Sequence, residues 1–273
     1  MNTFGFIGVG NMGGALAAAV CKNCPPSSVV LSNRTRRKAE LLAEKLGCRA
    51  ADNAGAAGSA KYLFLGVKPQ TMPELFAEIS PVLAGRYAAG DRFILVTMAA
   101  GLTMDAVAAM SGVPAPVIRI MPNTPLSVGE GMILYTAGGG VTEGEISDFV
   151  AALKGCGRLD RLEESQIDAA GVISGCGPAF VFQFAEALAK AGEGLGLSGE
   201  QARLYAEQTI LGAAKLALEA GEDLEKLRKA VCSPGGTTIE GVKSFEREDL
   251  NGMTERALRA SYRRTLELAG KKG

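Results

Sequence analysis

A glycine-rich loop with the spacing GxGxxG lies between an apolar run and an alanine-rich stretch at the start of the chain. The run 3–7 predicts a strand, and residues 12–22 predict a helix. Gly8 would permit the tight turn, Gly10 the approach of a pyrophosphate to the backbone, and Gly13 close packing of helix on strand. The positive end of the helix would face the phosphates. The segment therefore predicts a nucleotide site rather than a purely structural turn.

Short apolar runs alternate with helix-like stretches up to residue 162, which is typical of a parallel sheet covered on both faces. The expected strands are 3–7, 29–32, 62–67, 93–98, 117–120, 132–136 and 157–162. The helices expected between them are 12–22, 35–46, 71–84, 103–110 and 142–153. Beyond Glu163 only helices are expected, at 179–193, 199–219, 224–232, 238–247 and 253–268. We predict an α/β fold, with an N-terminal Rossmann-type doubly wound sheet over residues 1–162 and a C-terminal all-helical dimerisation domain over residues 163–273.

The stretch 167–218 carries more apolar surface than one surface helix needs to bury. Alanine and glycine occur on several of its faces at once. A helix that is apolar all round must be covered, and a domain of about 110 residues has few helices to cover it with. We therefore expect a homodimer or a larger homo-oligomer.

The chain contains no histidine, and its formal net charge is zero. Without imidazole it lacks the usual general acid/base, the commonest metal ligand and every triad built on histidine. A neutral chain has no global positive field to hold nucleic acid or an anionic membrane surface. We expect a small-molecule partner, no metal, no nucleic acid and no membrane.

The six cysteines are scattered, and Cys21 and Cys24 form the only CxxC pair. No thioredoxin-like context surrounds the pair, which favours chance spacing over a redox function, and a second pair at zinc-ligand spacing is missing. Glycines interrupt the apolar start, and we find no run of about 18 uncharged apolar residues for a membrane span. We expect a soluble cytoplasmic protein with reduced thiols.

The end of the second expected strand indicates the preferred cofactor. An NAD-specific site usually has an acidic residue here, but the chain has none before Glu40. Basic residues and small polar side chains favour NADP(H) instead, although NAD(H) stays possible. Asn33, Arg34 and Thr35 are the best candidates. The basic run 36–38 would either bind phosphate or form a solvated helix face.

Two further loops follow expected strands, at the sheet edge where such folds bind ligands. Lys68 lies in the first and is either a proton donor or an ordinary loop residue before a proline. In the second, Pro122 and Pro125 would fix the backbone around Asn123 and Thr124.

The segment 233–238, Ser-Pro-Gly-Gly-Thr-Thr, combines a glycine pair, three hydroxyls and the beginning of a helix. Free amides, a positive dipole end and short donors suit a bound carboxylate. An ordinary helix N-cap would explain the same residues equally well.

This segment resembles the signature of pyrroline-5-carboxylate reductases. The blocks 67–70, 119–131 and 175–180 are similar to the same family and keep its order, so the resemblance covers nearly the whole chain. Two departures are Cys176, where the family commonly has Ser, and Asp223-Leu224, where His-Pro is frequent.

The resemblance implies NADPH-dependent reduction of 1-pyrroline-5-carboxylate to L-proline, the last step of proline biosynthesis. The protonated imine is already an electrophile, so a site without histidine suffices. Thr238 and Ser233 would be catalytic, and Ser233, Gly235, Gly236, Thr237 and Thr238 would bind the substrate. The implied cofactor contacts are Ile7, Gly8, Gly10, Asn11, Met12, Gly13, Asn33, Arg34, Thr35, Asn53, Val67, Lys68, Pro69, Ala99 and Asn123.

Two alternatives compete with this interpretation. A β-hydroxyacid dehydrogenase shares the glycine-rich start and the helical second domain, but it needs a catalytic lysine. Lys190 and Lys215 are the only lysines between 155 and 225, and neither fits that family's pattern. A catalytically silent NADP-binding regulator would not need the hydroxyl-rich segment 233–238.

Overall fold

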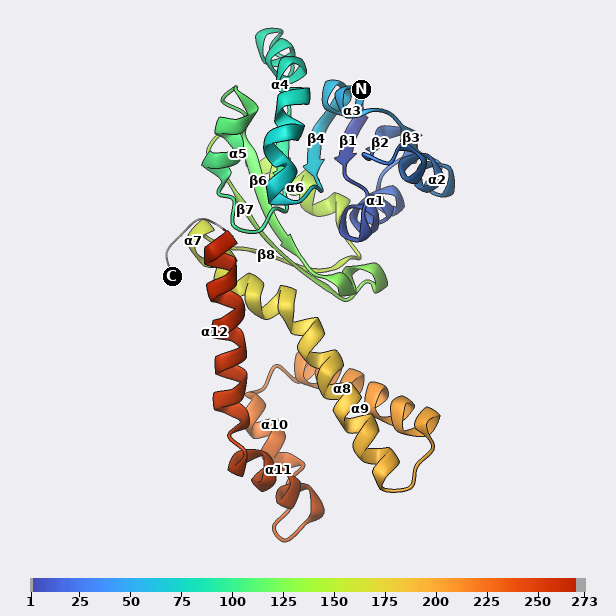
Figure 1. The fold of residues 1–273 in the computed structure, drawn as a ribbon, viewed down its shortest axis with the longest axis vertical. Coiled ribbons are helices and arrows are strands. Elements are labelled where there is room, and N and C mark those ends of the chain that lie inside the picture. The colour runs from blue at the N-terminus through green and yellow to red at the C-terminus, as the bar shows by residue number, and fades with distance from the viewer. Residues whose placement is uncertain (1, 269–273) are drawn as a thin grey trace. The chain divides into compact units, whose positions relative to one another are not determined.

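The computed structural model describes residues 2–268, which divide into two compact units. Residues 2–175 and 262–268 form the sheet unit, and residues 176–261 form the helical unit. Figure 1 shows the strands gathered in the first unit and the helices of the second.

The sheet unit contains one eight-stranded sheet in the order β3-β2-β1-β4-β5-β6-β7-β8. Its strands are β1 (Asn2–Ile7), β2 (Val29–Ser32), β3 (Arg49–Ala50), β4 (Ala60–Leu65), β5 (Ile94–Thr97), β6 (Val117–Pro122), β7 (Gly131–Ala137) and β8 (Gly157–Arg161). Strands β1 to β6 are mutually parallel, whereas β7 runs antiparallel to β6 and β8 runs parallel to β7. The expectation of a parallel sheet is therefore wrong at this edge. Only a short 3₁₀ segment, η3 (Thr124–Val128), joins β6 to β7, and a parallel crossover needs a dozen residues or more.

Helices cover both faces of the sheet. Helices α1 (Asn11–Asn23), α2 (Arg36–Leu46) and α6 (Glu143–Ala152) pack on one face, with Phe6 and Phe64 in their core. Helices α3 (Asn53–Ser59), α4 (Met72–Ala88) and α5 (Met104–Ser111) pack on the other, with Ile7 and Leu65. Alternate residues of a strand thus serve opposite cores, as the pleat requires.

Strand β3 and helices α3 and α7 (Glu164–Gly171) were not predicted from the sequence. Strand β3 has two residues, and α3 has the sequence NAGAAGS, in which alanine and glycine give no clear apolar periodicity. Asp52 starts the helix by accepting a hydrogen bond from Gly55 N at 2.7 Å. Ala56 and Ala57 are fully buried, so the small residues permit close packing on the sheet.

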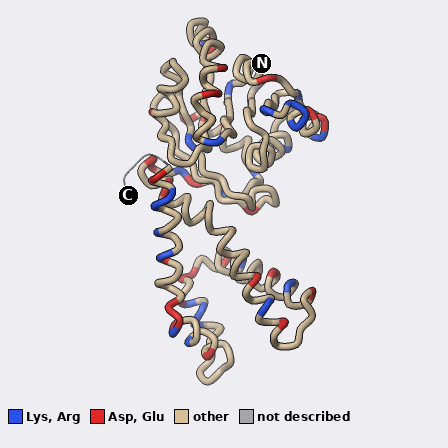
Figure 2. Tube along the Cα trace, in the orientation of Figure 1, with Lys and Arg blue, Asp and Glu red and all other residues tan. Residues whose placement is uncertain are grey.

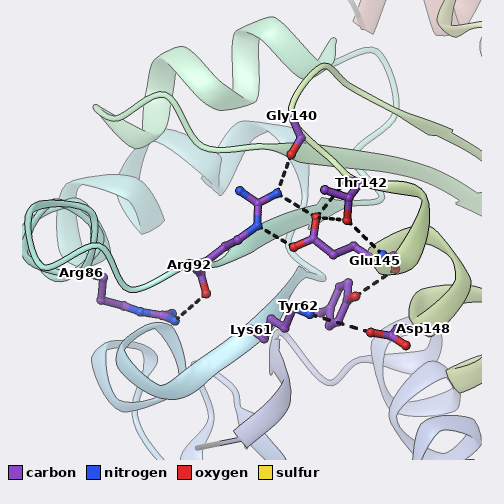
Figure 3. A network of polar contacts seen from close by, with 8 residues as sticks. All are labelled: Lys61, Tyr62, Arg86, Arg92, Gly140, Thr142, Glu145 and Asp148. Carbon is purple, nitrogen blue, oxygen red and sulfur yellow. Dashed lines mark hydrogen bonds and ion pairs between the residues drawn. The ribbon is translucent and has the colours of Figure 1, made fainter.

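A polar network anchors α6 to strand β4 and to the segment that precedes β5 (Figure 3). Arg92 donates from Nε and Nη2 to the two carboxylate oxygens of Glu145, at 2.5 and 2.7 Å. The Tyr62 hydroxyl donates to the backbone oxygen of Glu145 at 2.9 Å. The Arg92 guanidinium lowers the pKa of the Glu145 carboxyl to about 2, and hydrogen bonds from Thr142 act in the same direction.

The helical unit is thinly packed within one chain. Its elements are α8 (Gly177–Gly194), α9 (Gly199–Ala220), α10 (Leu224–Ala230), α11 (Thr237–Arg247) and the first part of α12 (Leu250–Leu268). Of the described residues from 177 onward, only Ala202 and Ala206 are buried. Phe182 is 67% exposed and Leu204 58% exposed.

Candidate functional site

The strand order reverses between β1 and β4, and the glycine-rich loop lies at this switch point. Gly8 has φ +95°, and a Cβ on it would lie 2.5 Å from the Gly66 oxygen, so the two loops meet through glycine backbones. Gly13 likewise packs directly against Gly8. A Cβ on Gly10, by contrast, would meet nothing within 4 Å. Packing within the protein therefore does not require glycine at position 10. A group bound over the loop would require it, because a side chain there would keep that group away from the backbone.

The amino end of α1 is open to an anion. Gly10 is its N-cap, none of the described side chains caps the helix, and its first turn contains no acidic residue. The amide of the preceding Val9 is already used, because it donates to Asn33 Oδ1 at 3.2 Å. Asn33 thus joins the end of β2 to the glycine-rich loop. This geometry fits the pyrophosphate of a dinucleotide.

The basic residues after β2 separate into two groups. Arg36 and Arg37 both pair with Glu40 along α2, at 3.0 and 3.7 Å, which supports the helix-face interpretation for these two. Arg34 is exposed, and no ion pair of it occurs in the described chain. Figure 2 shows the cluster of positive charge at the start of α2. Arg34 is therefore free to meet a phosphate.

Asn53 begins α3, and its carboxamide is held at both ends. Ser32 Oγ donates to Asn53 Oδ1 at 2.6 Å, and Asn53 Nδ2 donates to Glu78 Oε2 at 2.7 Å. Neither Ser32 nor Glu78 was among the candidates predicted from the sequence. Sequence alone offers no signal for Glu78, which lies on the exposed side of α4.

The remaining cofactor candidates also follow the carboxyl ends of strands. Val67, Lys68 and Pro69 come after β4, and Ala99 comes after β5 with its amide directed at Thr97 Oγ1, 3.3 Å away. Lys68 is exposed, and its backbone oxygen accepts hydrogen bonds from Thr71. Because β1 to β6 are parallel, all the cofactor candidates from Ile7 to Asn123 lie along one edge of the sheet.

Strand β6 is joined to α7 (Glu164–Gly171) and to the π-helical turn η4 (Val172–Cys176) by three contacts at regular spacing. Arg119, fully buried, pairs with Asp168. Two residues on, Met121 lies against Gly171, where a Cβ would come 2.9 Å from the Met121 Cγ. Asn123 then donates from Nδ2 to the Ser174 oxygen at 2.9 Å. Residues 119, 121 and 123 are two positions apart and lie on one side of the extended segment. They contact residues 168, 171 and 174, which are about three positions apart and lie on one side of the helix.

Neither Asp168 nor the role of Arg119 was recognised from the sequence. The sequence did contain one signal, because Arg119 is a charged residue inside an apolar strand. A charged side chain that is buried must be paired. Arg119 Nη1 also lies 3.7 Å from Glu164 Oε1, while its buried Nε has no hydrogen-bond partner among residues 2–268. The Asn123 carboxamide, predicted to contact the cofactor, is engaged on both sides, because its Oδ1 accepts from Met132 N at 2.8 Å.

The segment 233–238 belongs to the helical unit and forms a tight turn followed by α11. Gly236 N donates to Ser233 O at 3.0 Å, and Gly235 has φ +71°, as in a type II β-turn with Pro234 at its second position. Gly236 is the N-cap, so no threonine occupies that position, and no side chain in the described part of the chain caps α11. The hydroxyls of Ser233, Thr237 and Thr238 make no hydrogen bond within the described chain. An ordinary N-cap does not describe this geometry.

Comparison with known proteins gives two family matches. Residues 164–268 match the model for pyrroline-5-carboxylate reductase dimerisation. Residues 3–88 match the model for NADP oxidoreductase, coenzyme F420-dependent.

Individual relatives extend the similarity over the whole chain. A pyrroline-5-carboxylate reductase of Corynebacterium melassecola is 34% identical over 98% of this chain and 99% of its own length. The solved structure of a pyrroline-5-carboxylate reductase from Coxiella burnetii superposes with a TM-score of 0.88 and 32% identity, covering 100% of this chain and 99% of that one. The Plasmodium falciparum pyrroline carboxylate reductase with NADP bound gives 0.86 and 26% identity, with 98% of each chain covered.

Proposed function

The chain belongs to the pyrroline-5-carboxylate reductase family, and from this membership we propose how its own residues bind and position the reactants. Its reaction is the NADPH-dependent reduction of 1-pyrroline-5-carboxylate to L-proline, the last step of proline biosynthesis. The alternatives of a β-hydroxyacid dehydrogenase and of a silent NADP-binding regulator are not favoured. We assign dinucleotide binding to residues 1–162, and substrate binding and dimerisation to residues 163–273.

NADP(H) is assigned to the carboxyl edge of the sheet unit. The uncapped amino end of α1 and the open side of Gly10 fit the pyrophosphate. Asn33, Arg34 and Thr35 would hold the 2′-phosphate, because no acidic residue precedes Glu40 to repel it. Asn53, fixed by Ser32 and Glu78, would line the same end of the site. When bound, NADPH supplies the hydride.

The substrate is assigned to the turn 233–238. The amides near Gly236 and Thr237 and the Ser233 hydroxyl would hold the carboxylate at the uncapped end of α11. Thr238 would hydrogen-bond the ring nitrogen and relay a proton to or from water. The observation that carries this assignment is three hydroxyls without a hydrogen bond to any described residue, at a helix end that no described side chain caps.

Catalysis in this proposal depends on position more than on acid/base strength. The protonated C=N bond accepts hydride without a strong acid, and the chain has no histidine to supply one. Fixing the carboxylate and the ring nitrogen at two points orients the imine carbon. Holding reactants in line can supply several kcal/mol of a barrier, about 7 or more in favourable cases.

We also propose that the helical unit forms a homodimer or a larger homo-oligomer, and that the enzyme works in the cytoplasm. The span Glu164–Gly194 is long and apolar enough to cross a membrane by composition alone, and only 6% of its most apolar part is buried. The family match over 164–268 supports a second copy as its cover instead. Figure 2 shows α8 largely without charge near its start, as such an interface requires.

The test is spectrophotometric. NADPH oxidation is followed with 1-pyrroline-5-carboxylate, and cofactor reduction is followed in parallel with a 2-hydroxy and a 3-hydroxy acid. Turnover of the cyclic imine alone is expected. Turnover of a hydroxy acid alone would support a dehydrogenase, and no turnover of any substrate would support the silent regulator.

A further inference from the structure

Glu78 lies beside the assigned cofactor site, on the side of α4 that faces α3. The two helices pack against each other on one face of the sheet. Val82, one turn further along α4, also lies against α3, because a Cβ on Gly58 would come 3.4 Å from Val82 Cγ1. Residues four apart on a helix share a face, so Glu78 and Val82 both point toward α3.

The carboxylate of Glu78 is hydrogen-bonded to the carboxamide of Asn53. Asn53 Nδ2 donates to Glu78 Oε2 at 2.7 Å, and Ser32 Oγ donates to Asn53 Oδ1 at 2.6 Å. Ser32 is buried at the end of β2, and its backbone oxygen accepts from Gly8 N at 2.9 Å. These contacts connect the Asn53 carboxamide, through Ser32, to the glycine-rich loop of the cofactor site.

The two partners of this carboxamide constrain it unequally. A hydroxyl can donate or accept, so Ser32 would tolerate either the oxygen or the nitrogen of Asn53. An ionised carboxylate only accepts, so Glu78 excludes the orientation in which Asn53 Oδ1 would face it. Glu78 therefore determines which way the carboxamide points.

Asn33, at the same end of the site, is oriented by the same kind of constraint. Val9 N can only donate, and it donates to Asn33 Oδ1 at 3.2 Å. Asn33 Nδ2 donates to Thr35 O at 3.2 Å. Each of the two Nδ2 groups has two hydrogens, and bonds among residues 2–268 use one of them. One N–H of Asn33 and one of Asn53 are thus left for a ligand, and such donors suit a phosphate.

The charge of Glu78 by itself does not explain its place in this site. A carboxylate near a bound phosphate repels it, so charge alone would make Glu78 unfavourable for the cofactor. A role that depends on orientation explains why a group that can only accept contacts Asn53.

We propose that Glu78 is a positioning residue for NADP(H), which keeps the nitrogen of Asn53, rather than its oxygen, available to the 2′-phosphate. The inference rests on the cofactor site proposed above. Without Glu78 the carboxamide can turn over, and in the turned state its oxygen would meet the phosphate. The fraction of protein that is ready to bind then falls, and the apparent affinity falls by the same factor.

Binding of two nucleotides tests the proposal without turnover. Isothermal titration calorimetry compares adenosine 2′,5′-bisphosphate with adenosine 5′-monophosphate, which lacks the 2′-phosphate. Glu78→Ala should weaken binding of the bisphosphate by about three- to tenfold and binding of the monophosphate by less than about twofold. Glu78→Gln presents either a donor or an acceptor, so it permits both orientations and should weaken the bisphosphate by about twofold. Loss of charge alone would instead tighten it.

Glu74→Ala is the matched control for charge. Glu74 is exposed one turn earlier on α4, and it has no hydrogen bond or ion pair with residues 2–268. Its loss removes the same charge from the same helix and should not reduce the preference for the bisphosphate. Steady-state kinetics should show that Glu78→Ala raises KM for NADPH but not for NADH, with kcat unchanged.

A double-mutant cycle shows whether Glu78 acts through Asn53. Asn53→Ala should itself weaken the bisphosphate, and adding Glu78→Ala should then have no further effect. Helix α3 should survive the change at Asn53, because Asp52 is its N-cap. Thermal unfolding of each variant checks that it is folded.

Several outcomes would overturn the positioning role. They are tighter binding of the bisphosphate to Glu78→Ala or Glu78→Gln, an equal loss in Glu74→Ala, and a further loss when Glu78→Ala is added to Asn53→Ala. A wild type that prefers the bisphosphate, with a preference that Glu78→Ala leaves unchanged, would overturn this role and leave the cofactor site standing. A wild type that binds both nucleotides equally would overturn the assignment of the 2′-phosphate, and the inference with it.

Discussion

The carboxamide of Asn123 donates a hydrogen bond to the backbone oxygen of Ser174, 2.9 Å away, and so ties the end of β6 to the π-helical turn after α7. Its other side accepts from the Met132 amide at 2.8 Å. Asn123 is 8% exposed. Asn123, which the sequence predicts to contact the cofactor, therefore also joins three segments of the structure.

Asn123→Asp is expected to destabilise the protein by about 2 kcal/mol. The substitution keeps an acceptor for Met132 N but removes the donor and places a carboxylate against the Ser174 oxygen. Urea denaturation measures the change in unfolding free energy. Asn251→Asp, at an exposed helix position, is the control and should change stability by less than roughly 0.5 kcal/mol. Equal effects of the two substitutions would contradict the junction.

Thr238→Ala should lower kcat/KM for the imine by roughly ten to several hundred fold. This is the scale of one lost active-site hydrogen bond of about 1.5 to 3 kcal/mol. The Thr238 hydroxyl has no partner within the described chain, so folding and NADPH affinity should barely change. Steady-state kinetics and thermal unfolding are measured together.

Thr142→Ala is the matched control for Thr238. Thr142 is a true N-cap, with its Oγ1 accepting from Glu145 N at 3.3 Å. Its loss should cost about 1 kcal/mol of stability and leave kcat/KM unchanged. If Thr238→Ala behaves like Thr142→Ala, Thr238 stabilises its helix and does not act on the substrate.

Arg34→Asp should raise KM for NADPH far more than KM for NADH. A lost charged hydrogen bond to the 2′-phosphate gives a differential of about 1 to 3 kcal/mol. Arg37→Asp is the control, because Arg37 already pairs with Glu40. Kinetics with both cofactors decide the matter, and equal changes for NADPH and NADH in Arg34→Asp would refute the assignment.

Stability should fall in acid as Glu145 is protonated. Its folded pKa of about 2 lies below the ordinary 4.5, so its contribution is complete above pH 5 and is lost as the pH falls toward 2. Because Arg92 is half exposed and partly screened, the contribution is about 2 kcal/mol. Denaturation of wild type and Glu145→Gln between pH 2 and 7 should show a gap at neutral pH that closes in acid (Figure 3). A gap that is independent of pH would show that the ion pair is not its source.

Light scattering should give about twice the chain mass of 28.2 kDa, or a higher multiple, for the wild type at micromolar concentration. Leu204→Glu should shift the mass toward that of one chain, because Leu204 is 58% exposed on α9 within the family's dimerisation region. Leu41→Glu is matched to it in residue type and exposure, at 49% on α2, and should leave the assembly intact. An active, well-folded wild-type monomer would refute the dimer.

Most elements of the fold were predictable because their signals are local. The glycine-rich loop, the alternating runs and the helices after residue 163 each depend on spacing within a short window. Strand β2 has the bounds that the sequence predicts, and most other boundaries lie within a few residues of the predicted ones. Three elements were missed. Strand β3 is a two-residue edge strand, α3 is an Ala/Gly helix without contrast between faces, and α7 is a helix of eight residues.

The residue types of the candidate site were also visible in the sequence, because GxGxxG and the segment 233–238 are contiguous. Their partners were not visible. The contact of Arg119 with Asp168 joins residues 49 positions apart in the chain, and the reversed direction of β7 depends on how this strand pairs with β6. Such contacts depend on which strand edges pair and which face each helix presents. Sequence spacing determines the local conformation, but only packing in three dimensions determines which distant side chains meet.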